Sequence, residues 1–187
     1  ASTLRAETRL LPTTYIRGML ATVAPGRPPY AATSLAADIL SSRLFEELRT
    51  RRNLTYAVFA GLSAHRANYA VLYTTTTRPD LSVKLMRREL DALASHPIDR
   101  AELEGHVATL VTTYLLGIET NEDQADEMGL MQVVADHWQE AFRFVDQVRR
   151  VGAGQVQAAA RQLRAAGIAW GVLGNVKGLD RKTFTTP

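Results

Sequence analysis

The sequence predicts an α+β fold in which an antiparallel sheet is covered by helices on one face. Short runs with period-two alternation of apolar residues, typical of half-buried strands, alternate with longer runs of helical periodicity. Their order is strand, helix, strand, strand, helix, then a helical run and a final strand. The 187 residues, 46% hydrophobic and 22% charged, suffice for one sizeable core and show no compositional sign of disorder.

The first third of the chain contains one expected strand and one long helix. Residues 1–12 are polar and irregular and end in a proline, which predicts a linker or an edge strand. Residues 13–23 alternate as a first strand, and the prolines and glycine of residues 24–29 enforce a loop. Residues 30–52 carry apolar side chains three to five positions apart, which predicts a helix, and Asn53 is expected to end it.

The next segment predicts a hairpin followed by a helix. Two alternating runs, 54–63 and 68–77, are joined by a short polar segment, so antiparallel pairing is expected. A broad apolar face over residues 81–95 predicts a helix, with Asp80 as its N-cap and Pro97 as its stop.

The remainder is mainly helical and returns to the sheet only at its end. The strand expected at 168–176 completes a single domain over residues 13–178, and residues 179–187 are expected to be a tail. The four helices expected before that strand are 100–117, 121–136, 138–151 and 155–166.

Composition excludes several classes of function. The net charge is only +3 and the arginines are scattered among carboxylates, so no nucleic-acid partner is expected. No apolar run approaches the roughly 20 residues of a transmembrane helix, so we expect a soluble chain without a membrane segment. Cysteine is absent, which excludes thiolate chemistry and leaves the compartment open between bacterial cytoplasm and periplasm. No signal-peptide pattern occurs, and we expect a piece of a longer protein.

Metal and nucleophile motifs are also missing. No His-x-x-Glu-His motif or its reverse occurs. The nearest approach runs from His137 to Ala141, but alanine cannot bind zinc and no glutamate follows Glu140 as a further ligand. No G-x-S-x-G elbow marks a serine nucleophile. We therefore predict no metal site and no catalytic residue in this chain, whose four histidines are His65, His96, His106 and His137.

The stretch from Arg43 to Gly61 is the most informative, because it passes from a charged helix end into an apolar strand. Residues 48–61, LRTRRNLTYAVFAG, resemble the C-terminal-domain signature of the pitrilysin/insulinase family of zinc peptidases, which includes the mitochondrial processing peptidases. The family pattern is approximately S-R-L-F-x-x-L-R-x-x-x-x-L-x-Y. Eight positions match it in register: Ser42, Arg43, Leu44, Phe45, Leu48, Arg49, Leu54 and Tyr56.

This resemblance implies a peptidase built from two similar α+β halves with different roles. The halves face each other across a chamber and belong to one polypeptide or to two subunits. Zinc belongs to the N-terminal half, and the C-terminal half supplies an arginine and a tyrosine that reach the substrate. The chain is thus expected to be the substrate-positioning half of a zinc metalloendopeptidase, with Arg49 and Tyr56 contacting a peptide. Its expected partner is an N-terminal zinc-bearing domain or subunit; a homodimer or heterodimer stays open. Alone, the chain is expected to cleave nothing, and Arg43 to form a buried or interfacial ion pair.

Three alternatives remain at this point. Local chemistry also allows Arg49 to pair with Glu46 or Glu47 or to cap the helix end, while Tyr56 packs in the sheet. The fold would also suit a catalytically inert scaffold or assembly subunit. A basic nucleic-acid binder would show a steep dependence of binding on salt, and we expect none at physiological salt.

Overall fold

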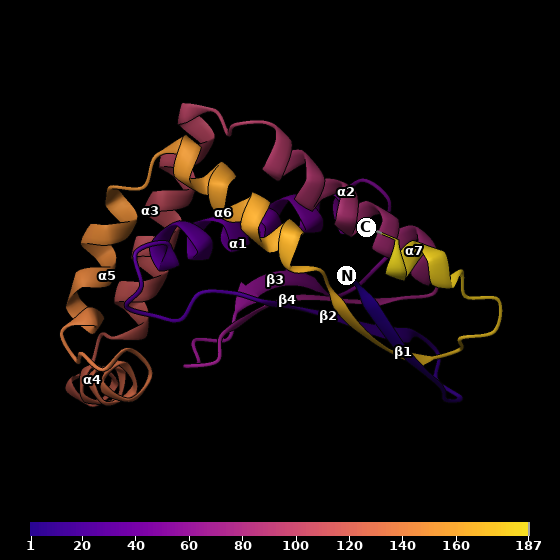
Figure 1. Ribbon diagram of the computed structural model, residues 1–187, viewed down its shortest axis with the longest axis horizontal. Coiled ribbons are helices and arrows are strands. Elements are labelled where there is room, and N and C mark those ends of the chain that lie inside the picture. Colours follow the sequence, from indigo (N-terminus) through magenta and orange to yellow (C-terminus); the bar gives the residue numbers. More distant parts are fainter. Residues whose placement is uncertain (187) are drawn as a thin grey trace.

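The computed structural model describes residues 1–186 and shows one five-stranded sheet with helices above one of its faces (Figure 1). The strand order is β1-β5-β2-β4-β3. Strand β2 is central and pairs antiparallel with β4 and β5, while β3 pairs antiparallel with β4. The predicted α+β class is confirmed, and the strands are β1 (Thr3–Thr8), β2 (Thr14–Ala21), β3 (Val58–Leu62), β4 (Tyr69–Thr76) and β5 (Ala169–Gly174).

The sheet contains one parallel pair, which the prediction of an antiparallel sheet did not include. Strand β1, within the stretch expected to be a linker or an edge strand, lies at the edge of the sheet and pairs parallel with β5. Its Leu4 is buried and lies opposite Trp170 of β5, so the strand contributes to the core despite its polar composition. The sequence in this stretch alternates too weakly to show which neighbour it joins.

Three helices form the layer that covers the inner face of the sheet. Helices α1, α2 and α6 pack against one another there, and α3, α4 and α5 continue the helical layer past the edge of the sheet (Figure 1). The main core lies between these layers, around Trp170, Ile16 and Leu72 from the sheet. The helices are α1 (Tyr30–Leu44), which continues as the π-helix η1 (Phe45–Thr50), α2 (Pro79–Ser95), α3 (Arg100–Gly117), α4 (Asn121–Ala135), α5 (Glu140–Arg149), α6 (Ala153–Ala166) and α7 (Arg181–Thr185).

Two expectations at element ends need correction. Asp80 is not the N-cap of α2: Arg78 occupies that position, and Pro79 stands at the first helical residue, where its missing N–H costs nothing. The stretch 179–187, expected to be a tail, contains helix α7, which packs on α2 and β1. Phe184 of α7 is fully buried and meets the ring of Trp170 edge to face, with centroids 5.8 Å apart. A single aromatic residue in a polar stretch carries no periodicity that could have predicted this helix.

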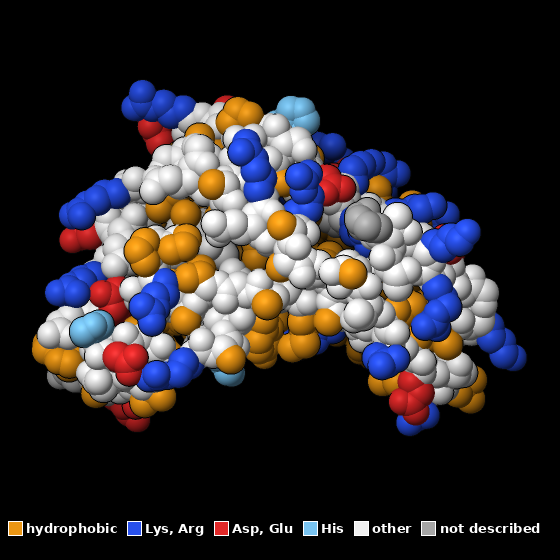
Figure 2. All heavy atoms as spheres, in the orientation of Figure 1, with side chains coloured by type: hydrophobic (Ala, Val, Ile, Leu, Met, Phe, Trp, Pro, Cys, Tyr) orange, Lys and Arg blue, Asp and Glu red, His pale blue; other side chains and the backbone are white. Residues whose placement is uncertain are grey.

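The outer face of the sheet is open among the described residues and carries large apolar side chains. Figure 2 shows the molecule as an arch that is hollowed on the side of the sheet, with hydrophobic side chains inside the hollow. The exposed apolar residues of this face include Tyr15 and Met19 of β2, Phe59 of β3 and Leu173 of β5. Within residues 1–186, no helix combines the length and apolar character needed to cross a membrane.

Candidate functional site

The predicted helix-to-strand corner is built on a change of helix type. At Phe45 the α-helix widens into the π-helix η1, in which the Arg51 N–H donates to the Glu46 carbonyl at 2.9 Å. Asn53 then adopts a positive φ of 49°, a conformation that asparagine tolerates better than most residues, and the chain reverses. The Leu54 N–H donates to the carbonyl of Leu48 at 2.8 Å. π-helical turns are rare and frequently occur at functional sites.

One group of motif residues serves packing. Leu44 and Leu48 are fully buried, one turn apart, and Leu54 packs against the same core. Arg43 forms a half-buried ion pair with Glu102, in which three N–H···O contacts of 2.9–3.0 Å join the end of α1 to the first turn of α3. The ion pair expected for Arg43 is therefore confirmed, and these residues hold the corner in place.

The other group of motif residues forms an exposed cluster. The guanidinium carbon of Arg49 lies 4.9 Å from the ring centroid of Phe45 and 5.2 Å from that of Tyr56. Both distances are within the roughly 6 Å over which a cation interacts with an aromatic face. The side chains are open to solvent, and Tyr56 is 84% exposed. The structure thus brings together the two residues that the resemblance singled out and adds Phe45, which the helical periodicity placed with the apolar packing residues but which is 43% exposed.

The ion pair of Arg49 and the packing of Tyr56 in the sheet, expected from local chemistry, are wrong. Among the described residues no carboxylate lies within ion-pair distance of Arg49, because its neighbours have other partners. Glu46 pairs with Arg51 at 3.1 Å, and Glu47 pairs with Arg52 at 2.8 Å and with Arg88 of α2. Tyr56 lies in the loop before β3 and does not pack in the sheet. The guanidinium of Arg49 keeps its hydrogen-bond donors available to a partner from outside.

Glu47 forms ion pairs that hold the π-helix in place. Its carboxylate is almost entirely removed from solvent, and burial raises its pKa. Hydrogen bonds and charges from Arg52 and Arg88 outweigh that effect, so the pKa of Glu47 lies below its ordinary value. Because Arg88 belongs to α2, this contact ties η1 to the helical layer beside Arg49.

The loop that carries Tyr56 is held from behind by hydroxyl groups. The Thr55 hydroxyl donates to the Ala57 carbonyl at 2.7 Å and accepts from the Thr74 hydroxyl of β4 at 3.1 Å. The Thr76 hydroxyl donates to the Leu54 carbonyl at 3.0 Å. The expected strand over residues 54–63 begins only at Val58, because the Leu54 carbonyl is bonded to a threonine side chain of β4 and not to its backbone.

The described residues do not fit a zinc site. Residues 1–186 contain no group of three or more histidine and carboxylate side chains arranged to hold a metal ion. The Nδ1 atom of His106 lies 2.7 Å from a carboxylate oxygen of Asp38, and His137 is exposed before α5. The corner around Arg49 likewise offers hydrogen-bond donors and aromatic surface, not metal ligands.

Comparison with known families identifies this architecture. Residues 5–110 match the family described as the peptidase M16 inactive domain. The chain belongs to this family. The matched range includes the whole helix-to-strand corner, and the absence of a zinc site from the described residues agrees with the description of the domain as inactive.

Relatives of this M16 inactive domain are zinc proteases by name. Proteins of Mycobacterium bovis and Mycobacterium tuberculosis, each named as an uncharacterized zinc protease, are 28% identical to the chain over 138 residues. The match covers 72% of the chain and 32% of each relative, so the chain spans about a third of their length.

Solved structures share the fold of this M16 inactive domain. The peptidase M16 inactive domain from Pseudomonas fluorescens superposes with a TM-score of 0.79 at 21% identity, over 92% of this chain and 43% of that one. A chain of complex III2 from Candida albicans superposes with a TM-score of 0.84 at 14% identity, over 97% and 48%. At these identities the likeness concerns the fold alone.

Proposed function

We propose that this M16 inactive domain positions a peptide for cleavage by a separate zinc-bearing N-terminal half, and that Arg49 and Tyr56 make the contacts. The observation that carries the proposal is the exposed cluster of Phe45, Arg49 and Tyr56, whose side-chain polar groups have no hydrogen-bond partner among residues 1–186. An arginine between two aromatic rings on a rigid corner is organised for a partner, since a solvated arginine gains little from such an arrangement.

The chemistry of the two groups suits a peptide backbone. A guanidinium presents up to five donors in a planar fork, and a phenol donates one hydrogen bond. Both can donate to a peptide carbonyl, or to its oxygen as negative charge develops during attack. The rings of Phe45 and Tyr56 restrict the orientation of the guanidinium, which lowers the entropy lost when the peptide binds.

The partner half is inferred from the relatives. They are named zinc proteases, and 32% of their length corresponds to this chain, so their remaining residues offer room for a zinc-bearing half. Zinc would be held there, since the donor set of residues 1–186 does not fit it. Whether the two halves share one polypeptide or associate as subunits does not change the role of Arg49 and Tyr56.

The test is peptide turnover by the two halves together. Arg49→Ala should lower kcat/KM by about 10- to 100-fold, as expected when a charge-assisted hydrogen bond worth roughly 1.5–3 kcal/mol is lost. Tyr56→Phe should lower it by about 2- to 10-fold, because one neutral hydrogen bond is removed. Arg51→Ala is the matched control, since Arg51 is exposed on the same turn but pairs with Glu46. Turnover at the wild-type level in both test variants would overturn the proposal.

A second candidate is an inert assembly subunit with the same fold. The apolar side chains on the open face of the sheet favour it, because they offer a contact surface that needs no catalytic group. This candidate predicts unchanged turnover in the Arg49 and Tyr56 variants. It also predicts loss of the complex when Phe59 or Tyr15 on that face is replaced by serine, measured by sedimentation.

A further inference from the structure

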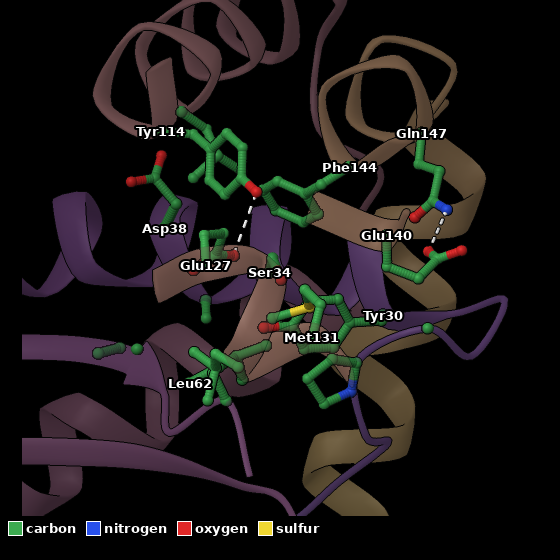
Figure 3. A pocket seen from close by; sticks show the side chains of 18 residues that line it. Tyr30, Ser34, Asp38, Leu62, Tyr114, Glu127, Met131, Glu140, Phe144 and Gln147 are labelled. Carbon is green, nitrogen blue, oxygen red and sulfur yellow. Dashed lines mark hydrogen bonds between the residues drawn. The ribbon is translucent and has the colours of Figure 1, made fainter. Parts of the chain in front are cut away.

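A cavity of about 350 Å3 lies beside the N-terminal half of α1, between α1, α3, α4, α5 and the end of β3 (Figure 3). None of Phe45, Arg49 and Tyr56 lines the cavity: Asp38, its lining residue on α1 nearest the corner, precedes Arg49 by eleven residues, about 16 Å along a helix, although Ala60 and Gly61 of β3 reach its wall. Its volume falls within the roughly 300–1,000 Å3 of small-molecule sites. Its walls are mainly apolar, with a few polar groups that come from different helices.

Three aromatic rings from three helices meet in the cavity wall. The rings of Tyr114 and Phe144 lie 4.9 Å apart between centroids, and those of Tyr30 and Phe144 lie 5.9 Å apart, in tilted arrangements. Figure 3 shows the rings of Tyr114 and Phe144 next to each other, with Tyr30 below them and the Glu127 carboxyl group beside the Tyr114 hydroxyl. A wall of this kind favours an apolar stem or a cation against its ring faces.

The charged groups of the cavity are all acidic. Asp38, Glu127 and Glu140 line it, and none of its described lining residues is lysine, arginine or histidine. Two of the carboxylates have partners behind the wall: His106 lies 2.7 Å from Asp38, and Arg143 donates to Glu140 at 3.2 Å. Gln147 also donates to Glu140, at 2.8 Å.

Glu127 is the carboxylate whose charge is not balanced. Within residues 1–186 no cationic group lies within ion-pair distance of it, and its one hydrogen bond comes from the Tyr114 hydroxyl at 3.1 Å. That hydroxyl is also 2.6 Å from the Ala141 carbonyl and has only one proton to donate. When the proton points to the nearer carbonyl, the half-buried Glu127 carboxylate has no donor from residues 1–186.

The field of Glu127 acts on both tyrosines of the wall. Burial raises the pKa of Tyr114 well above its ordinary value, and the negative charge of Glu127 raises it further. Burial also raises the pKa of Tyr30; a hydrogen bond with Ser34 opposes this, and the charge of Glu127 adds to it. The same field that disfavours a second negative charge favours a positive one.

We propose that this cavity binds a cationic group on an aliphatic stem, a guanidinium or a protonated amine, with its charge against Glu127 and its stem against Phe144 and the two tyrosine rings. A charge-assisted hydrogen bond to Glu127 and cation–π contact with the rings provide the affinity. Two sources share this chemistry: a basic side chain of a bound peptide and a free small cation. This proposal does not depend on whether Arg49 and Tyr56 contact a peptide.

The test compares a cation with its neutral isostere on the full 187-residue chain. Butylguanidinium and N-butylurea have nearly the same shape and differ in charge; each is titrated while the aromatic side-chain NMR signals are followed. We expect millimolar binding of butylguanidinium, with shifts of the Tyr30, Tyr114 and Phe144 signals, and binding of N-butylurea at least about tenfold weaker. Equal binding of the two probes, or no binding of butylguanidinium at tens of millimolar, would overturn the proposal.

Variants then locate the charge. Glu127→Gln should weaken butylguanidinium by about tenfold, while Glu104→Gln, an exposed change on α3, should leave it unchanged. Unchanged affinity in a folded Glu127→Gln variant would contradict the role of Glu127 as the group that binds the cation. If that variant does not fold, the comparison of butylguanidinium with N-butylurea on the wild-type chain tests the proposal. A peptide Ac-Ala-Arg-Ala-NH2 that binds more tightly than butylguanidinium identifies a peptide side chain as the source, and equal or weaker binding identifies a free cation.

Discussion

Replacing Glu47 by glutamine tests whether the π-helix beside Arg49 is held by charge. The carboxylate accepts hydrogen bonds from Arg52, at 2.8 Å, and from Arg88. Charge-assisted bonds of this kind contribute about 1.5–3 kcal/mol each when shielded. Because the arginine side chains are 44% and 53% exposed, solvent screening reduces that figure, and we expect Glu47→Gln to lower the free energy of unfolding by about 1–2 kcal/mol. For a chain of this size the melting temperature should fall by about 2–8 °C.

The pH dependence of this loss identifies its cause. The pKa of Glu47 is lowered in the folded state, so its contribution is fully present above the ordinary glutamate pKa of about 4.3 and is lost as pH falls through the lowered value. The difference in unfolding free energy between the wild type and Glu47→Gln, measured by urea denaturation, should therefore shrink towards zero as pH falls below about 4. Glu46→Gln is the matched control, because Glu46 pairs with Arg51 at the exposed surface and should cost less than about 1 kcal/mol. A difference of the same size at pH 7 and well below pH 4 would refute the reasoning.

Two further substitutions test the packing of the sheet, each measured by urea denaturation. Gly18→Ala would place a Cβ 2.7 Å from the Trp170 ring and 2.8 Å from Ile168, so it should destabilise the fold by about 1–3 kcal/mol. The control is Gly61→Ala on β3, whose Cβ would meet nothing within 4 Å and should be tolerated. Equal effects of the two substitutions would contradict this packing. Phe184→Ala should cost about 3–5 kcal/mol because it removes a fully buried ring beside Trp170, with the exposed Thr185→Ala as control; a loss below about 1 kcal/mol would show that α7 is not part of the core.

The sequence predicted most of the fold because most elements carry strong periodicity. The alternation in β2 matches its burial residue by residue, and the hairpin of β3 and β4 and the long helices were all expected. The parallel pairing of β1 and the helix α7 were not. Both depend on contacts between the two ends of the chain, such as Leu4 beside Trp170 and Phe184 against its ring, and no local pattern encodes such contacts.

The sequence suggested two members of the candidate site, Arg49 and Tyr56, but neither the third, Phe45, nor their arrangement. The spacing of the motif identified Arg49 and Tyr56 through resemblance, while local chemistry alone favoured ion pairs of Arg49 with Glu46 or Glu47. Local chemistry was misleading because it could not include Arg88, which lies on a different helix and pairs with Glu47. The cavity around Glu127 left no signal in the sequence, because its lining comes from helices far apart along the chain.

The spacing of the motif follows from the geometry of the corner. The side chains at the end of the helix form two neighbouring stripes. Leu44 and Leu48 point into the core, and Phe45 and Arg49 point to solvent. The reversal at Asn53 brings Leu54 back to the carbonyl of Leu48, so the next residues pass beside Arg49 and place the Tyr56 ring 5.2 Å from its guanidinium. The seven residues that separate Arg49 from Tyr56 are therefore the length of chain needed to end the π-helix, reverse direction and pass back beside Arg49. The buried leucines keep this geometry, and they leave the side chains of Phe45, Arg49 and Tyr56 exposed to solvent.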